Sequence, residues 1–523
     1  MELLKLEEMT VEQKVGMLLC ARRFWKNTDD VDFILELVKK RALGCVQAPF
    51  NQPEIIKKIK ETADYPIILV NDTERGYPTS PRPKVPLICL AATGNKDYVR
   101  SFARCLVADA KADNCNGTWG PVIDILNSDG PCRVSRVFSD DPQKVAEYAE
   151  EIARVYNENH YFSCGKHYPG SGKDGVDTHM MGAYNDYTEE ELIERNLVPY
   201  IHLWKKGLLP SIMVDHSTFV KIDPERPASL SKKVIDIIRN MGYDGVMFSD
   251  SFAMMAILQE FGEEKLYGMA VNAGIDIVLP NYMTPVRETY ELLLQNYKDG
   301  AFTEERLNEA VRRVLNLMEF VATEPETPLV ITKEDEENLA AISRDCITAV
   351  CDEGLTAAIG DVNKKRLFVV LTENDFEVLG EGEEITVGKW YYPNNIAQKI
   401  KKEFPNSEVI YLKEFSSAAE NDKILRTATK YDEVVCVTFC TTTCYLGTDS
   451  LTRRTEAVLN ALAFSKKLKT IVHFGNPHAL LPVLHVPRKI FGYMITESQE
   501  YAIDILAGKL EAKGTLPFNI QYK

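Results

Sequence analysis

Short apolar runs recur through the first half of the chain, and most are followed by a stretch with the periodicity of an amphipathic helix. Continuous apolar runs are typical of strands that are buried on both faces, whereas half-exposed strands alternate apolar and polar positions. We interpret as strands residues 43–47, 66–70, 87–90, 120–125, 162–164, 211–214, 245–248 and 275–279. Their alternation with helices, expected for instance over 142–159, 189–206 and 232–241, predicts parallel strands joined by helices.

Eight such units predict an α/β fold of the (β/α)8 TIM-barrel type. The alternative is an open, doubly wound parallel sheet, but the chain lacks the Gly-x-Gly-x-x-Gly that commonly follows the first strand of that fold. Further helices are expected from Pro285 to Val321. The barrel is therefore predicted to occupy residues 1–321.

A second domain is expected after the barrel. Residues 322–332 contain two prolines among threonine and glutamate, a composition typical of a linker. A helix is expected from Lys333, and apolar runs then predict strands at 366–371, 408–412, 433–438, 469–474 and 489–494. Residues 333–523 are thus predicted to form a smaller three-layer α/β domain with a supporting role.

The composition narrows the range of partners. The 523 residues are 45% hydrophobic and 26% charged, which is ordinary for a globular protein. The formal net charge of −16 argues against nucleic acid or an anionic membrane as a partner. No run of about 18 apolar residues predicts a membrane span, and the charged N-terminus does not resemble a secretory signal. We expect a cytoplasmic location; the oligomeric state stays open.

The twelve cysteines lie mostly in apolar, strand-like contexts, so we expect reduced thiols in the core rather than disulfides. Cys436, Cys440 and Cys444 follow one another at four-residue spacing, and thiolates are zinc ligands. They lack the Cys-x-x-Cys spacing of most zinc sites. Neither a metal nor another cofactor is therefore expected.

The loop from Lys166 to His179 concentrates reactive side chains. It contains three glycines and a proline, and it places Lys166, His167, Asp177 and His179 after an apolar run that we interpret as a strand. Binding and catalytic residues are commonly found on loops that a rigid scaffold positions. This segment is therefore the first candidate for an active site.

Polar side chains also follow most of the other predicted strands. In TIM barrels the active site lies at the carboxyl ends of the strands. Any one of these residues has another explanation, since Asp250 could simply cap a helix. Together they predict an active site built from Asp72, Glu74, Asp124, Asn127, Arg133, Arg136, Asp215, His216, Asp250 and Asn281 besides the loop.

Several of these segments resemble the motifs of family 3 glycoside hydrolases, in the β-N-acetylglucosaminidase branch. The loop Lys166-His-Tyr-Pro-Gly-Ser-Gly with Asp177-Thr-His179 is similar to that branch's Lys-His-Phe-Pro-Gly-His-Gly run, which is followed at the same spacing by Asp-Ser-His. Gly242-Tyr-Asp-Gly-Val-Met-Phe-Ser-Asp250 resembles its nucleophile segment. Further matches, in the family's order, are residues 72–74, 120–124, 136–142, 227–231 and 273–276.

The resemblance implies a retaining, exo-acting β-N-acetylglucosaminidase (a β-N-acetylhexosaminidase). It would remove terminal, non-reducing β-linked N-acetylglucosamine from small glycans or cell-wall fragments. Asp250 would form the covalent glycosyl intermediate, and His179, oriented by Asp177, would be the acid/base. An imidazole with a pKa of about 6.5 can deliver a proton near neutral pH. The residues expected to bind the sugar are Asp72, Arg136, Lys166 and His167.

Three departures from the branch pattern are visible: Ser171 in place of the loop's second histidine, Ser251 after the nucleophile, and Asn71-Asp-Thr-Glu-Arg75. They leave the catalytic pair intact but affect the loop and the leaving-group subsite.

Other functions remain open from the sequence. A histidine acid/base is neutral when it acts as a base, so phosphate could replace water and the enzyme would be a phosphorylase of β-N-acetylglucosaminides or β-glucosides. A metal-dependent barrel hydrolase could use His167, His179, His216 and Asp250 as ligands. A sugar sensor without turnover is a third alternative. The expected partner is in every case a small carbohydrate.

Overall fold

The computed structural model describes residues 2–22, 28–48, 52–126, 131–170, 176–373, 390–442, 444–445, 447 and 449–522. The chain forms two compact units that are interleaved in the sequence. The first contains Met1–Arg82, Val99–Gly130 and Asp141–Glu336; the second contains Pro83–Tyr98, Pro131–Asp140 and Glu337–Lys523. The boundaries that the linker composition suggested, at 321 and 333, stay a prediction.

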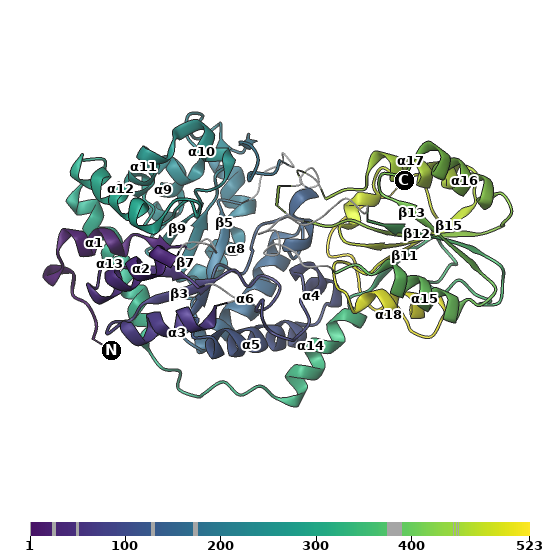
Figure 1. The fold of residues 1–523 in the computed structure, drawn as a ribbon, viewed down its shortest axis with the longest axis horizontal. Helices are drawn as coiled ribbons and strands as arrows, with labels where there is room; N and C mark the ends of the chain where they lie inside the picture. The colour runs from purple at the N-terminus through teal and green to yellow at the C-terminus, as the bar shows by residue number, and fades with distance from the viewer. Residues whose placement is uncertain are drawn as a thin grey trace. The chain divides into compact units, whose positions relative to one another are not determined.

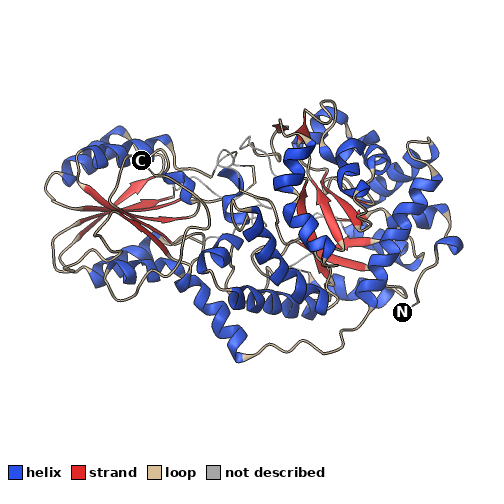
Figure 2. Ribbon diagram, turned by 180° about the vertical axis from the view of Figure 1, so that it is seen from behind, coloured by secondary structure: helices blue, strands red, loops and turns tan. Residues whose placement is uncertain are grey.

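Eight parallel strands form a closed ring in the first unit (Figure 2). Two four-stranded sheets run in the orders β1-β2-β3-β4 and β10-β9-β7-β5. Bridges between Leu19 and Val278 and between Gly117 and Phe162 join them at both edges. The strands are β1 Cys20–Ala21, β2 Cys45–Gln47, β3 Ile68–Asn71, β4 Gly117–Thr118, β5 Cys164–Tyr168, β7 Ser211–Val214, β9 Val246–Ser251 and β10 Ile277–Leu279. The barrel expected from the apolar runs is confirmed.

Amphipathic helices surround this ring (Figure 1). α9 illustrates why they form: the Ser231 side chain caps its start, and its apolar residues at 234, 235, 237 and 238 are buried. The helices are α1 Val11–Met17, α2 Thr28–Lys39, α3 Pro53–Thr62, α5 Lys96–Ala112, α6 Pro142–Glu158, α8 Val198–Lys205, α9 Lys232–Asn240, α10 Met255–Phe261, α11 Glu263–Ala273, α12 Val286–Lys298 and α13 Glu304–Ala322. A short parallel pair, β6 Tyr184–Asn185 and β8 Thr218–Phe219, lies outside the ring.

Three expectations about elements of the barrel were wrong. Residues 87–90 form part of helix α4, Leu87–Thr93, rather than a strand. Leu87 to Ala92 are all buried, and a short apolar run does not distinguish a buried helix from a strand. The missing strand is β1, which is only two residues long. The run 120–125 follows β4 and forms one bridge, at Val122. The single helix expected over 189–206 is divided into α7 Glu189–Glu191, a π-helical turn Leu192–Asn196 and α8.

The second unit has a six-stranded sheet in the order β11-β16-β15-β14-β12-β13. α15 and α18 cover one face and α16 and α17 cover the other (Figure 1), which confirms three layers. All five predicted strands form; β11, which pairs antiparallel with β16, was not predicted. The elements are α14 Lys333–Asp345, β11 Thr348–Cys351, β12 Leu367–Thr372, α15 Pro393–Glu403, β13 Glu408–Lys413, α16 Ala418–Ala428, β14 Val434–Phe439, α17 Arg453–Phe464, β15 Leu468–Phe474, β16 Arg488–Phe491 and α18 Ser498–Leu506.

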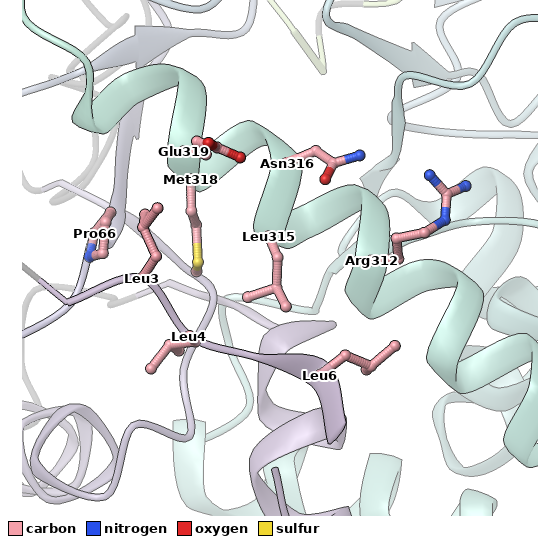
Figure 3. Close-up of a pocket in the computed structure, with 9 residues that line it drawn as sticks. All are labelled: Leu3, Leu4, Leu6, Pro66, Arg312, Leu315, Asn316, Met318 and Glu319. Atoms are coloured by element: carbon pink, nitrogen blue, oxygen red, sulfur yellow. The ribbon is translucent and has the colours of Figure 1, made fainter. Parts of the chain in front are cut away.

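A pocket of about 230 Å³ lies between the N-terminal segment and α13 (Figure 3). Leu3, Leu4, Leu315 and Met318 line it together with Pro66, which stands just before β3. The pocket is therefore near the amino ends of the strands, opposite the end where barrel active sites lie. No helix in the described ranges is both long and apolar enough to cross a membrane.

We expect Asp449 to make the stability of the protein depend on pH. This side chain is 2% exposed, and burial raises its pKa to about 7. An unfolded carboxyl titrates at about 3.9, so between about pH 4 and pH 7 the unfolded chain releases a proton that the folded chain keeps. The free energy of unfolding therefore falls as the pH rises through this window. Asp449→Asn should remove the fall, on the order of 1–3 kcal/mol.

Thermal unfolding of the full chain at pH 4.5 and pH 8 measures this effect. The advantage of Asp449→Asn over the wild type should grow towards pH 8. The exposed Asp432 offers a matched control, because Asp432→Asn removes the same charge from a solvated position. Parallel pH profiles for Asp449→Asn and the wild type would mean that the buried carboxyl is already ionised in the folded protein.

Candidate active site

A buried lysine lies at the carboxyl end of β5 between two carboxylates. The Nζ atom of Lys166 is 2.7 Å from Asp72 Oδ1 and 2.7 Å from Glu74 Oε1, both on the loop that follows β3. The Lys166 side chain is 3% exposed, whereas that of Asp72 is 48% exposed. The ammonium group is thus held in place while one carboxylate still faces solvent. Such a pair can donate to and accept from the hydroxyl groups of a sugar.

His167 connects this group to Asp250. Its backbone N–H donates to Asp124 Oδ1 over 3.0 Å, and its Nδ1–H donates to Asp124 Oδ2 over 2.8 Å. The buried carboxylate therefore selects the ring orientation and leaves Nε2 pointing away from it. That nitrogen lies 4.0 Å from Asp250 Oδ2. Two strand ends, those of β5 and β9, thus bring their side chains to one place.

Asp250 lies near the end of β9 with its side chain 17% exposed. Burial alone would raise its pKa, but the neighbouring imidazoles, His167 first, and the N–H of Ser251 hold this pKa below its ordinary value. The Ser251 N–H donates to Asp250 Oδ1 over 2.7 Å. Asp250 is therefore an ionised carboxylate at neutral pH, with Oδ2 on the side of His167. This is the state that nucleophilic attack requires.

His216 stabilises the turn after β9 by a hydrogen bond to its backbone. Its Nε2–H donates to the carbonyl of Ser251 over 3.0 Å, and the Ser229 hydroxyl lies 2.8 Å from Nδ1. The ring stacks on Phe252 with centroids 5.3 Å apart. Burial lowers the pKa of His216, so the ring is neutral with both nitrogens in use. It positions the backbone beside Asp250 and has no nitrogen left for proton transfer.

The loop that holds His179 is anchored close to Asp250. The Nδ1–H of His179 donates to Asp177 Oδ1 over 2.8 Å, and the carboxylate also accepts the backbone N–H of His179 over 3.0 Å. The carbonyl groups of Thr178 and His179 accept N–H bonds of 3.2 Å and 3.1 Å from Ala256 and Met255 at the start of α10. Because α10 follows β9 directly, the His179 imidazole is held near the nucleophile and contributes to its lowered pKa.

Six of the seven predicted site residues lie in the first unit, at the carboxyl ends of β5 and β9 or on the loops after β3 and β5: Asp72, Lys166, His167, Asp177, His179 and Asp250. Arg136 ends the 3-10 helix Pro131–Arg136, which belongs to the second unit, and its role stays a prediction. Ser171 and Asn127 lie outside the described residues. The roles that these residues are predicted to play are not tested by their positions alone.

Three further side chains take part in the site: Glu74 and Asp124 were expected there without an individual role, and Arg22 was not expected. Glu74 is the second partner of Lys166, and Asp124 is the partner of His167. Both lie in segments that were singled out by their motifs, so a signal existed. Arg22, whose Nη1 contacts the Ser251 hydroxyl, follows β1. Because β1 was not predicted, nothing in the sequence pointed to Arg22.

The histidines considered as metal ligands make hydrogen bonds within the site. His167 and His179 each use Nδ1 on a carboxylate, and His216 uses both nitrogens. Within the described ranges no three His, Cys, Asp or Glu side chains are grouped so that they could hold a metal ion.

The closed parallel barrel presents an ionised aspartate and a carboxylate–imidazole pair at the carboxyl ends of its strands. These are the groups that a glycosidase needs. The family model described as "Glycosyl hydrolase family 3 N terminal domain" matches residues 10–317, more than half of the chain. The chain therefore belongs to glycoside hydrolase family 3, and the protein is a glycoside hydrolase.

Named relatives are distant. The chain is 25% identical over 405 residues to a protein of Cellulomonas fimi named beta-N-acetylglucosaminidase/beta-glucosidase, covering 72% of this chain and 71% of that protein. It is 26% identical over 233 residues to a beta-hexosaminidase of Tolumonas auensis, covering 43% and 69%.

Two solved structures share the fold over most of this chain. A family 3 beta-N-acetylglucosaminidase from Paenibacillus aligns with a TM-score of 0.80 and 22% identity, covering 98% of this chain and 100% of that one. A beta-glucoside phosphorylase aligns with a TM-score of 0.81 and 20% identity, covering 98% and 95%. The architecture of the whole described chain is therefore that of solved family 3 proteins.

Proposed function

We propose that this protein is a retaining, exo-acting β-N-acetylglucosaminidase that releases terminal β-linked N-acetylglucosamine from small glycans or cell-wall fragments. One observation supports it most: the Asp177–His179 pair is tied by two backbone hydrogen bonds to the helix that follows Asp250. The His179 imidazole and the Asp250 carboxylate therefore lie on neighbouring elements, which supports the roles proposed for them. The names of the relatives support the N-acetylglucosamine preference.

In the first step the Asp250 carboxylate would attack the anomeric carbon. A bond forms between Asp250 and that carbon as the glycosidic bond breaks, and the electron pair passes to the departing oxygen. His179 would give that oxygen its proton through Nε2. Asp177, which accepts from Nδ1–H, stabilises the orientation of the ring.

In the second step a water molecule would attack the same carbon. Neutral His179 takes the proton of the water, the bond to Asp250 breaks, and the electron pair returns to the carboxylate. Two inversions at one carbon give net retention of configuration. The imidazole has then returned to its starting protonation state.

The terminal sugar would be held by the Lys166, Asp72 and Glu74 group together with His167. The exposed oxygen of Asp72 can accept a hydroxyl proton, and the Lys166 ammonium can donate. Because these partners also fix one another, they are already oriented before the sugar arrives. Hydroxyl groups at the non-reducing end would be recognised in this way, which suits exo-action.

Phosphorolysis is the second candidate, since the acid/base is a histidine whose carboxylate partner Asp177 lies on the Nδ1 side of the ring. The acceptor would approach Nε2, and the imidazole ring is neutral when Nε2 takes up a proton from the acceptor. An anionic acceptor is not repelled there as it would be by a carboxylate.

The test is turnover of an aryl β-N-acetylglucosaminide beside the matching aryl β-glucoside, each with and without inorganic phosphate. We expect the N-acetylated substrate to be preferred and the free sugar to be the product. Formation of sugar 1-phosphate would establish the phosphorylase instead. A lack of N-acetyl preference would contradict the substrate assignment.

The cytoplasmic location is also a proposal. The eleven cysteines whose side chains the structure describes are free thiols and most of them are buried, which suits a reducing compartment. Cell fractionation with an antibody to the protein would test it.

A further inference from the structure

Arg22 is a half-buried arginine at the carboxyl end of β1, beside the proposed nucleophile. Its Nε–H donates to Gln47 Oε1 over 2.6 Å, and its Nη1 donates to Ser251 Oγ over 2.5 Å and to the carbonyl of Pro280 over 3.3 Å. The guanidinium also lies over the ring of Tyr282, with its carbon 5.1 Å from the ring centroid. The last residues of β2 and β9 and the residues after β10 thus hold one cation at the active-site end of the barrel.

No carboxylate of the described residues forms an ion pair with this guanidinium. The partners recorded for Arg22 in the described part of the chain are an amide oxygen, a hydroxyl group, a carbonyl group and a ring, all of them neutral. No donor bond from Nη2 is found among the described residues. Removing a cation from water without a counter-charge is costly, so an unbalanced guanidinium at a site points to an anion.

Three other arginines of the same unit, unlike Arg22, pair with a carboxylate. Arg239, Arg306 and Arg313 surround the buried carboxylate of Asp276, with nitrogen–oxygen distances of 2.9, 2.7 and 3.3 Å. Asp276 stands just before β10, near the amino ends of the strands, where such pairs hold the barrel together. These three barrel arginines are therefore neutralised by a buried carboxylate, whereas the contacts of Arg22 are neutral.

The position of Arg22 indicates which part of a substrate it faces. The groups suited to sugar hydroxyls, Lys166 and Asp72, lie at the ends of β3 and β5. Arg22 lies beyond Asp250 on the β9–β10–β1 side of the ring, since its Nη1 contacts the residue after the nucleophile. This side is left for the group attached to the departing oxygen, and then for the acceptor that replaces it.

We propose that Arg22 binds an oxyanion, a carboxylate or a phosphate, in the subsite that the leaving group occupies first and the acceptor occupies second. The inference rests on the proposed glycosidase function and adds a charge preference to it. A carboxylate on the leaving group would be bound in the first step. If phosphate is the acceptor, its oxygen forms a bond to the anomeric carbon as the bond to Asp250 breaks and the electron pair returns to that carboxylate.

The subsite is preorganised for this task. Gln47, Ser251 and the Pro280 carbonyl hold the Nε and Nη1 atoms of the guanidinium, and the Tyr282 ring supports its plane. The third nitrogen, Nη2, keeps N–H donors for the oxygen atoms of an anion. An arginine is suited to such a contact because its donors are held in one plane.

The first experiment compares two aryl β-N-acetylglucosaminides, one with a carboxylate on the leaving group and one with a neutral amide there. The measured quantity is the ratio of their kcat/KM values. Arg22→Gln should lower this ratio about tenfold to a hundredfold, because a charge-assisted contact is lost. Arg22→Lys should restore part of it. The matched control is Arg312→Gln. Arg312 lies on α13 and pairs with Asp244, so its loss should leave the ratio unchanged.

The second experiment distinguishes the two sources of the oxyanion without relying on turnover. Inorganic phosphate and benzoate are titrated separately into the wild type and into Arg22→Gln, and binding is followed by calorimetry. Weakening of benzoate alone by at least tenfold assigns the subsite to a carboxylate on the leaving group. Weakening of phosphate alone assigns it to the acceptor, and weakening of both supports a shared subsite.

An unchanged substrate ratio together with unchanged binding of both anions in Arg22→Gln would overturn the inference. Absence of turnover of either substrate by the wild type would count against the glycosidase function instead. In that case the anion titrations still decide whether Arg22 binds an oxyanion.

Discussion

Asp250→Asn should abolish turnover, with kcat lowered by about 10⁴-fold or more. The substitution keeps the size and shape of the side chain and retains an oxygen that can accept the Ser251 N–H. It removes the charge that the neighbouring imidazoles favour and the nucleophile that forms the glycosyl ester. Steady-state hydrolysis of an aryl β-N-acetylglucosaminide measures the loss, and calorimetry with N-acetylglucosamine checks that sugar binding survives.

Asp215→Asn provides the comparison. Asp215 follows β7, and its carboxylate accepts the Ser217 hydroxyl, so the same chemical change is made at a neighbouring strand end without touching the nucleophile. Its activity should fall far less than that of Asp250→Asn. Residual activity of a few per cent in a well-folded Asp250→Asn enzyme would mean that another group attacks the sugar.

Azide gives a sharper version of this test. In Asp250→Gly the space of the carboxylate is open, and azide can attack the anomeric carbon from the side that Asp250 occupied. One displacement inverts the carbon, so an α-glycosyl azide is expected from a β-linked aryl substrate. A β-azide, or none, with the fold intact by circular dichroism, would contradict the assignment.

His179→Gln should show the second largest effect, and its size should depend on the leaving group. With an alkyl or sugar leaving group, which needs a proton to depart, kcat/KM should fall about 10³-fold. With 2,4-dinitrophenolate as the leaving group no proton is needed in the first step, so that step should be nearly unaffected. The second step still lacks its base, and a burst of dinitrophenolate followed by slow turnover is expected in stopped-flow measurements.

Two variants complete the test of the proton donor. Asp177→Asn should reproduce part of the same dependence on the leaving group, because the amide no longer accepts from the Nδ1–H of His179. His202→Gln removes a histidine whose Nε2 lies 2.6 Å from Glu150 on the outer helices, and it should change neither rate. Equal losses with both leaving groups in His179→Gln would indicate that this histidine only supports the loop.

The barrel was predictable because its central strands are buried on both faces and appear as apolar runs at even intervals. The two errors in counting its strands have one cause. α4 and β1 are short buried segments, and in such segments neither periodicity nor length distinguishes helix from strand. Pairing with β2 and with the residues near β10 makes Cys20–Ala21 a strand, and these contacts join distant parts of the chain.

In the site, too, features within one short motif were predictable, whereas contacts between distant segments were not. The Asp177–His179 pair and the sequence around Asp250 were visible because each lies within one short motif. The partnership of Lys166 with Glu74, the support of Ser251 by His216 and the position of Arg22 were not. Each of these contacts joins the carboxyl-end regions of different strands, and no spacing along the chain encodes it.

The sequence alone determined the alternation of strands and helices, the family resemblance and the identity of the side chains expected to act on a sugar. Its local patterns suffice for these because burial and turn chemistry act on neighbouring residues. Only the tertiary structure decided which charges compensate one another: two carboxylates around Lys166, imidazoles beside Asp250, and no carboxylate among the described residues beside Arg22. Electrostatic interactions depend on distance in space, and closure of the barrel sets those distances.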